Sequence, residues 1–139
     1  MTLKNIGMIN FFDFAKAKER FNKSTKQILD KYNIMGIYGI YLNDELVYIG
    51  QSINIKNRWI KHKENIEKPI IVLEDREKGL DVLYNKLGDY YRANVENIYF
   101  CVLEKVNNKK ELKKLENKYI EYFKPKYNIR YWHFHINMI

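Results

Sequence analysis

Two apolar stretches joined by a polar turn form the clearest pattern along the chain. Residues 36–42 and 46–50 are rich in β-branched and aromatic side chains, and Asn43-Asp44-Glu45 separates them. Such a pattern predicts a β-hairpin. A third stretch, residues 97–104, is apolar almost without interruption, which is typical of a strand buried on both faces.

The stretch before the hairpin, residues 10–33, predicts two short helices. Asn10 and Asp13 are candidates for one cap, and Ser24 with Gln27 fits a capping box that opens a segment ending at residue 30. No catalytic or metal-ligating grouping falls in this stretch. We expect it to pack against the rest of the protein or to bind a partner.

Two more helices have clear ends in the sequence. Residues 54–64 predict a helix with Asn54 as its cap, and residues 109–124 predict a helix that Pro125 ends. The tail that follows, residues 127–136, suggests a last strand.

Residues 65–97 give a mixed signal. Residues 69–78 fit a helix ended by Gly79, but the apolar run 70–73 also fits a strand, and residues 80–91 predict a second helix. We interpret this stretch as an insertion.

The order of these elements predicts one α+β domain over residues 1–139, in which helices flank a small central mixed or antiparallel sheet. The chain shows no internal repeat and no Ser-, Gly- or Pro-rich linker. Residues 1–35 form a helical N-terminal extension, residues 36–129 form the core with an insertion at about 65–97, and residues 130–139 form a C-terminal strand or tail.

The composition indicates a soluble globular protein. The chain has 139 residues, of which 46% are hydrophobic and 30% charged, so it has enough apolar material for a core and is not of the disordered class. No run approaches the roughly 18 apolar residues of a membrane span, and the N-terminus lacks the features of a signal peptide. The single cysteine, Cys101, cannot form an internal disulfide, so we expect a cytoplasmic protein.

The net charge of +8 arises from 25 Lys and Arg residues against 17 Asp and Glu residues. A surplus of this size favours polyanions, with nucleic acid as the first candidate partner and acidic membranes as the second. Charge alone does not separate this interpretation from a surface that is simply rich in lysine.

One carboxylate of the helix over residues 109–124 falls on its apolar side. At about 100° per residue, the apolar arc contains Leu112, Leu115, Tyr119, Ile120 and Phe123, and Glu116 falls inside this arc. Burying a carboxylate costs free energy unless a cation, a metal or strong donors compensate it. Two interpretations remain open: an ion pair at the rim of the core, with Arg58 or a lysine, and a functional carboxylate.

Arg58 and His62 lie four residues apart and share one face of the helix over residues 54–64. Arg58 offers a forked, permanently charged set of donors that fits a phosphate. His62 fits a proton relay or a support for a tyrosine hydroxyl. Taken alone, the pair also fits a solvated basic helix, and the neighbouring Trp59 fits packing better than base stacking.

Tyr38 and Tyr48 share one face of the hairpin only in one register. A two-residue turn that pairs Leu42 with Glu45 would put the tyrosines on opposite faces, whereas a three-residue loop or an equivalent bulge would put both on one face. A shared site therefore predicts an odd loop or a bulge.

Taken in order, these residues resemble the GIY-YIG nuclease family. Gly36-Ile37-Tyr38 and Tyr48-Ile49-Gly50 are the tripeptides that name the family, Arg58 follows ten residues after Tyr48, and His62 stands where members commonly have His or Tyr. The stretches 115–117 and 124–128, with Glu116 and Asn128, are similar to the closing motifs of the family. The resemblance covers about residues 36–64 and 98–129. Gln51 departs from members that have a lysine there.

The resemblance implies a DNA endonuclease with a shallow phosphate-binding surface. Its candidate catalytic residues are Tyr38, Tyr48, Arg58, His62, Glu116 and Asn128. Glu116 would be the sole protein ligand of one Mg²⁺ or Mn²⁺, a sparse ligation that is normal for Mg²⁺ at phosphates, and no organic cofactor is expected. The products would carry 5′-phosphate and 3′-hydroxyl ends.

The same resemblance suggests a role for each group. Tyr38 is favoured as the general base, although a free tyrosine with a pKa of about 10 needs help at neutral pH. Tyr48 would orient the phosphate or the water, Arg58 would neutralise the transition state, and Asn128 would brace the site. Asn128 also fits a simple turn.

Family members differ in how they select DNA, and a stand-alone nuclease of the phage, mobile-element or restriction kind fits this chain best. We expect target choice to come from residues 1–35, residues 65–97, a homodimer or another partner. The main alternative is a nucleic-acid-binding module that keeps the fold without turnover. A structural or adaptor protein is a second alternative, but it gives no reason for a carboxylate in an apolar arc.

Overall fold

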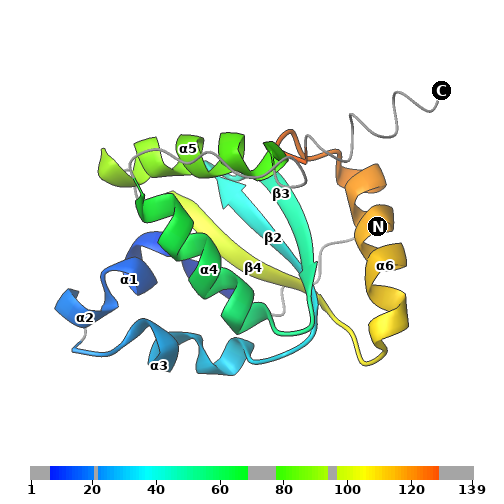
Figure 1. The fold of residues 1–139 in the computed structure, drawn as a ribbon, viewed down its shortest axis with the longest axis horizontal. Coiled ribbons are helices and arrows are strands. Elements are labelled where there is room, and N and C mark those ends of the chain that lie inside the picture. Colours follow the sequence, from blue (N-terminus) through cyan, green and yellow to red (C-terminus); the bar gives the residue numbers. More distant parts are fainter. Residues whose placement is uncertain (1–6, 21, 69–77, 94–96, 129–139) are drawn as a thin grey trace.

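The structure is a computed structural model of the chain, and it describes residues 7–20, 22–68, 78–93 and 97–128 (Figure 1). The strands are β1 (Gly7–Asn10), β2 (Gly36–Leu42), β3 (Glu45–Ser52) and β4 (Ile98–Lys105). The helices are α1 (Phe11–Ala15), α2 (Ala17–Arg20), α3 (Thr25–Leu29), α4 (Ile55–Glu67), α5 (Lys78–Arg92) and α6 (Leu112–Phe123), with short 3₁₀ turns η1 (Asp30–Tyr32) and η3 (Lys109–Glu111).

The four strands form one antiparallel sheet in the order β1-β4-β2-β3. The α+β class with a small central sheet is therefore confirmed, and the sheet is antiparallel rather than mixed. Strand β1 corrects the expectation that the N-terminal extension is only helical, because Gly7 to Asn10 pair with Val102 to Tyr99 of β4. Four residues are too few to display the alternation that identifies a strand in a sequence.

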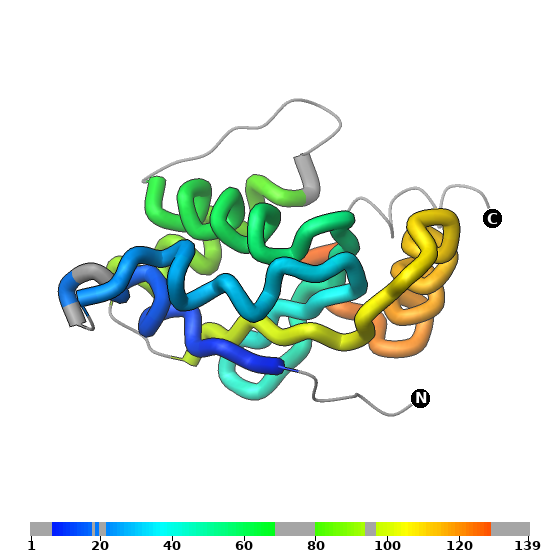
Figure 2. Tube along the Cα trace, turned by 90° about the horizontal axis from the view of Figure 1, so that it is seen from below, coloured from blue at the N-terminus to red at the C-terminus, as the bar shows by residue number. Residues whose placement is uncertain are grey.

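Helices cover both faces of this sheet (Figure 2). One apolar cluster lies between the sheet and helices α1, α3, α4 and α5, and it includes the fully buried Trp59 and Phe100. A second cluster joins the other face to α6 through Ile37, Tyr119 and Ile120. Trp59 is thus a packing residue, as its position in the sequence indicated.

A two-residue turn connects β2 to β3. Asn43 and Asp44 both have positive φ, at 51° and 70°, which is the conformation of a type I′ turn, and Leu42 pairs with Glu45 across it. If this register continued along the hairpin, Tyr38 and Tyr48 would lie on opposite faces of the sheet.

A bulge next to the turn changes the register. Tyr41 pairs with Leu46, but the preceding Ile40 pairs with Tyr48, so β3 holds one extra residue, Val47. Beyond the bulge Tyr38 pairs with Gly50. Tyr38 and Tyr48 therefore share a face, through the bulge and not through a three-residue loop.

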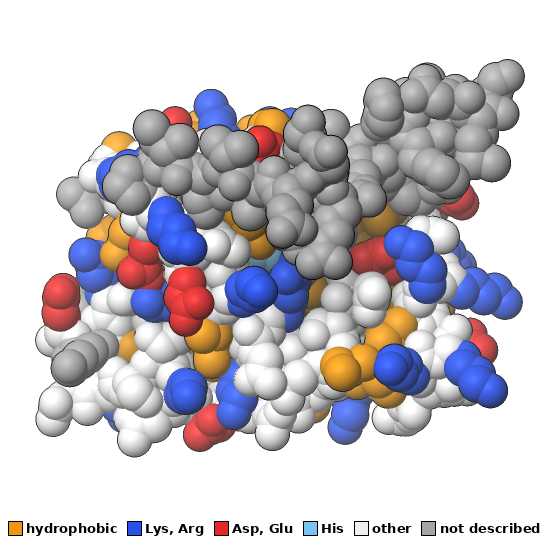
Figure 3. Space-filling model, viewed as in Figure 1, with side chains coloured by type: hydrophobic (Ala, Val, Ile, Leu, Met, Phe, Trp, Pro, Cys, Tyr) orange, Lys and Arg blue, Asp and Glu red, His pale blue; other side chains and the backbone are white. Residues whose placement is uncertain are grey.

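The predicted helix over residues 54–64 is α4, and the Asn54 side chain caps it by accepting from the Asn57 N–H at 3.0 Å. Figure 3 shows Lys and Arg side chains near the middle of the face that carries this helix and toward α6. Among the described residues, no helix has both the length and the apolar content needed to cross a membrane.

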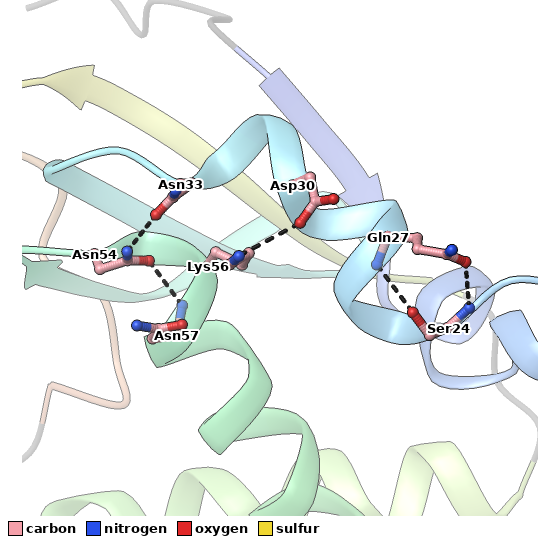
Figure 4. Close-up of polar contacts among 7 residues, drawn as sticks. All are labelled: Ser24, Gln27, Asp30, Asn33, Asn54, Lys56 and Asn57. Atoms are coloured by element: carbon pink, nitrogen blue, oxygen red, sulfur yellow. Dashed lines mark hydrogen bonds and ion pairs between the residues drawn. The ribbon is translucent and has the colours of Figure 1, made fainter.

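The N-terminal segment holds the first turn of α4 through several polar contacts (Figure 4). Asn54 Nδ2 donates to Asn33 Oδ1, and Lys56 Nζ lies 3.4 Å from Asp30 Oδ1. The Ile55 N–H also donates to the Ile34 carbonyl at 2.8 Å. Residues 30–34 therefore fix where α4 begins, and with it the position of the helix face that carries Arg58.

The caps predicted for the N-terminal segment are also present. Asn10 Oδ1 accepts from the Phe12 N–H at 2.8 Å, and Ser24 and Gln27 form the reciprocal capping box. The segment holds three short helices and η1, where the pattern predicted two helices.

Helix α5 includes the predicted helix over residues 80–91, but Gly79 lies inside it, so the prediction that Gly79 ends a helix is wrong. The alternatives for residues 69–77, and the strand or tail expected over residues 130–139, lie outside the described residues. After α6, Lys124 closes the helix in the left-handed conformation, residues 126–127 form a turn, and neither Tyr127 nor Asn128 is in a strand.

Candidate active site

Four of the six predicted site residues meet on the face of the sheet that α4 and α5 cover. The hydroxyl of Tyr38 on β2 lies 2.6 Å from Nε2 of His62 on α4. The ring of Tyr48 lies 6.4 Å from that of Tyr38 and 6.1 Å from that of His62. Arg58, one helical turn before His62, acts on both tyrosine hydroxyls and opposes the rise of their pKa values.

His62 and Tyr38 form the buried part of this group. His62 is fully buried and Tyr38 is 1% exposed. Burial and the Arg58 cation hold the pKa of His62 well below its ordinary value, so the imidazole is neutral. Burial and the neighbouring Tyr48 raise the pKa of Tyr38 well above its ordinary value, while Arg58 acts in the opposite direction.

Tyr48 is less buried than Tyr38 and His62, because its burial is intermediate. Burial raises the pKa of the Tyr48 hydroxyl, the Arg58 cation opposes this rise, and the Glu116 carboxylate adds to it. A cation from α4 and a carboxylate from α6 therefore act on the same hydroxyl, although α6 packs mainly on the other side of β3.

Among the described residues, the negative charge of Glu116 is compensated by one ion pair with an exposed lysine. Its side chain is 12% exposed, and its Oε1 lies 3.0 Å from Nζ of Lys113, which is itself 73% exposed. The ion pair foreseen for the rim of the core is thus formed with a lysine and not with Arg58. Pairs of this kind contribute about 0–1 kcal/mol, so this contact does not explain why a carboxylate occupies the position.

Asn128 holds the strand that carries Tyr48 through two hydrogen bonds to its backbone. Its Oδ1 accepts from the Ile49 N–H at 2.9 Å, and its Nδ2 donates to the Ile49 carbonyl at 2.8 Å. The Tyr127 N–H also donates to the Val47 carbonyl at 2.9 Å. The side chain thus pairs with the outer edge of β3 between Tyr48 and Gly50, beside the bulge.

The glycines of the two tripeptides are required by close contacts. A Cβ on Gly50 would lie 2.5 Å from the hydroxyl oxygen and 2.6 Å from Cζ of Tyr38. A Cβ on Gly36 would overlap the backbone carbonyl oxygen of Glu104. The first glycine therefore lets β2 approach β4, and the last one makes room for the Tyr38 ring.

A family model for the GIY-YIG catalytic domain matches residues 34–128. The chain belongs to the GIY-YIG family. The resemblance of the motifs is thereby confirmed, and it places the protein in a family of nucleases.

Among solved structures, a similar one is the GIY-YIG N-terminal endonuclease domain of UvrC from Thermotoga maritima, a point mutant bound to its catalytic divalent cation. The sequences are 22% identical, the match covers 73% of this chain and 90% of that chain, and the TM-score is 0.43. No curated protein sequence matches the chain.

Glu116 of this GIY-YIG domain fits a metal ion that takes few protein ligands. Among the described residues, no three His, Cys, Asp or Glu side chains come together as a metal site. Zinc sites usually take three or four such ligands, whereas Mg²⁺ at a phosphate takes one or two carboxylates and completes its shell with water and phosphate oxygens. Glu116 beside Tyr48 fits the second kind of site.

The sequence did not identify Tyr84 of α5 as part of this group. Its hydroxyl lies 2.7 Å from Nδ1 of His62, and the side chain is 1% exposed. The pattern of residues 80–91 indicated only that Tyr84 falls on a helix. Nothing local marks a contact between residues 22 positions apart.

We expect Gly50→Ala to disturb the Tyr38–His62 contact of the GIY-YIG site. The added Cβ meets a ring that is buried and hydrogen-bonded, so either the ring or β3 must move, at a cost of about 1–3 kcal/mol. Thermal unfolding should show this loss of stability. Gln51→Ala, on the same strand, is the control and should leave it nearly unchanged, and equal melting temperatures for the two variants would contradict the contact.

Proposed function

We propose that the protein is a metal-dependent endonuclease that hydrolyses DNA phosphodiester bonds and leaves 5′-phosphate and 3′-hydroxyl ends. The observation that carries this proposal is that Arg58 from α4 and Glu116 from α6 both act on the hydroxyl of Tyr48, a residue of intermediate burial. A fixed cation suits a phosphate, and a carboxylate near it suits a divalent metal ion. The surplus of positive charge over the whole chain favours DNA as the polyanion.

Glu116 would hold Mg²⁺ or Mn²⁺. When bound, the cation would polarise the scissile phosphate, stabilise the leaving 3′ oxygen and offset the negative charge of Glu116 at Tyr48. Arg58 would bind a non-bridging phosphate oxygen and contribute most when negative charge builds up in the transition state. Figure 3 shows Lys and Arg side chains near the middle of the face that carries α4 and toward α6, which suits a polyanion.

The burial of the two tyrosines favours a different division of roles from the one suggested by the sequence. Tyr38 was favoured there as the general base, but its side chain is 1% exposed and its hydroxyl is engaged by His62. Tyr48 is the more exposed of the two, and both charged groups act on it. We therefore assign contact with the attacking water to Tyr48. Tyr38 and His62 would instead hold Arg58 in position.

Tyr48 as the base requires that its pKa fall on substrate binding. In the free protein burial and Glu116 raise it, with Arg58 opposing them. The Arg58 cation already lowers the pKa of Tyr48 in the free protein. A metal ion held by Glu116 would offset the carboxylate charge and so remove its upward effect on that pKa. Asn128 would keep Tyr48 in place through its two hydrogen bonds to Ile49.

The ends of the products test the proposed chemistry. A labelled DNA duplex is incubated with the protein and Mg²⁺ or Mn²⁺, and the products are treated with DNA ligase directly and after phosphatase. Products that ligate directly, and fail to ligate after phosphatase, support hydrolysis to a 5′-phosphate and a 3′-hydroxyl. Products with 3′-phosphate ends would contradict it. Salt-sensitive binding of DNA with no products would support the non-cutting module instead.

A further inference from the structure

Tyr84 contacts the site indirectly, through His62. The two ring nitrogens of His62 bond to two different hydroxyls, Nε2 to Tyr38 at 2.6 Å and Nδ1 to Tyr84 at 2.7 Å. All three side chains are at most 1% exposed. One imidazole therefore connects Tyr84 of α5 to Tyr38 of β2, and Tyr38 in turn contacts Arg58.

A neutral imidazole carries a proton on only one nitrogen, so the two hydrogen bonds of His62 must run in the same sense along the chain of groups. Either Tyr38 donates to Nε2 and Nδ1–H donates to Tyr84, or both bonds are reversed. His62 is neutral here because it is fully buried and lies one turn from the Arg58 cation. The sense of the bonds is then decided at Tyr38.

The surroundings of the Tyr38 hydroxyl favour the first arrangement. The Arg58 cation, which lowers the pKa of this hydroxyl, has donors and no acceptor, so it favours a Tyr38 proton that points away from it. A buried O–H needs an acceptor, and the one that the described residues provide to Tyr38 is Nε2 of His62. Tyr38 therefore donates to His62, the imidazole proton lies on Nδ1, and the oxygen of Tyr84 accepts it.

We propose that Tyr84 is a positioning residue that accepts from Nδ1–H of His62 and holds the imidazole in place, so that Tyr38 donates to Nε2 and its oxygen stays available to accept from Arg58. A phenol oxygen has two favourable directions in the plane of its ring. When the proton points toward His62, the other direction is open to the guanidinium. The inference deepens the proposed function and rests on it for the role of Arg58 at the phosphate.

Tyr84→Phe removes the acceptor and keeps the ring. Nδ1–H would then be a buried donor without a partner, which is among the least tolerated polar groups in a protein interior. Moving the proton to Nε2 gives no relief, because the Tyr38 proton would then face Arg58, which has no acceptor. The imidazole is instead expected to lose its fixed position beside Tyr38, so that the Tyr38 oxygen is held less well for Arg58. We expect kcat to fall about 10-fold with little change in KM, as for the loss of one hydrogen bond to a charged group.

The test is the tautomer itself, observed by ¹⁵N NMR of protein labelled at histidine, since protonated and unprotonated imidazole nitrogens resonate far apart. The chain has 3 histidines, and a His62→Gln sample assigns the signal. We expect Nδ1–H in the wild type. Tyr84→Phe should change the Nδ1 and Nε2 resonances of His62, because one hydrogen bond is lost, and Tyr90→Phe, the same change on the same helix, should leave them unchanged. An Nε2–H wild type, or unchanged His62 resonances in Tyr84→Phe, would overturn the inference.

Cleavage kinetics on the same three proteins separate this inference from the proposed function. A lower kcat for Tyr84→Phe together with changed His62 resonances supports both. A lower kcat with unchanged His62 resonances overturns the positioning role and leaves the nuclease. Changed His62 resonances in a protein that never cleaves DNA support the hydrogen-bond arrangement and count against the proposed function alone.

Discussion

Glu116→Ala is expected to abolish metal-dependent cleavage while the protein remains folded. A metal ion acting as a Lewis acid supplies several kcal/mol of transition-state stabilisation, so the loss should be at least about 10³-fold. Stability should change by no more than about 1 kcal/mol, because the ion partner of Glu116 is the exposed Lys113. Cleavage rates with Mg²⁺ and a thermal unfolding curve of each protein measure the two effects.

Glu111→Gln is a matched control for this substitution. Glu111 is an exposed carboxylate just before α6, and its loss should leave both cleavage and stability unchanged. Calorimetric titration with Mn²⁺ adds a readout independent of turnover, since Glu116→Ala should weaken binding and Glu111→Gln should not. Unfolding of Glu116→Ala would instead support the structural ion pair that the sequence left open.

Arg58→Ala should lower the cleavage rate at least about 10²-fold, as for removal of a charged donor that acts on the transition state. The effect should appear in kcat more than in KM, because the phosphate gains negative charge as the reaction proceeds. Arg58→Lys should recover only part of the rate, since a lysine cannot offer the forked donors that reach both tyrosines and a phosphate.

Lys61→Ala provides the comparison for Arg58→Ala. Lys61 is an exposed cation on the same helix, three residues after Arg58, and its loss removes one positive charge without touching the tyrosines. We expect a small, salt-dependent change in KM for this variant. A near-normal kcat for Arg58→Ala, or an equal loss for Lys61→Ala, would remove Arg58 from the site.

Local signals in the sequence predicted the elements that present the site. The capping box at Ser24 and the cap at Asn54 are formed, and the antiparallel hairpin is where its apolar stretches indicated. The requirement that Tyr38 and Tyr48 share a face predicted a bulge or an odd loop before any coordinates, and the bulge is present. Short-range geometry was sufficient for these features.

Long-range contacts account for what the sequence did not provide. Strand β1 exists because β4, which pairs its Gly7 with Val102, lies beside it. The contact of Asn128 with Ile49 spans 79 positions, and that of His62 with Tyr84 joins two helices. The burial that separates Tyr38 from Tyr48 likewise depends on helices that fold back over the sheet, which no local pattern displays.

Nicking of supercoiled plasmid by the wild type and by Glu116→Ala, each with Mg²⁺, with Mn²⁺ and with EDTA, tests the central claim most directly. The account predicts open-circular or linear product for the wild type with a divalent metal, and none with EDTA or with Glu116→Ala. Equal cleavage by the two proteins, or cleavage by the wild type in EDTA, would contradict a metal-dependent site built on Glu116.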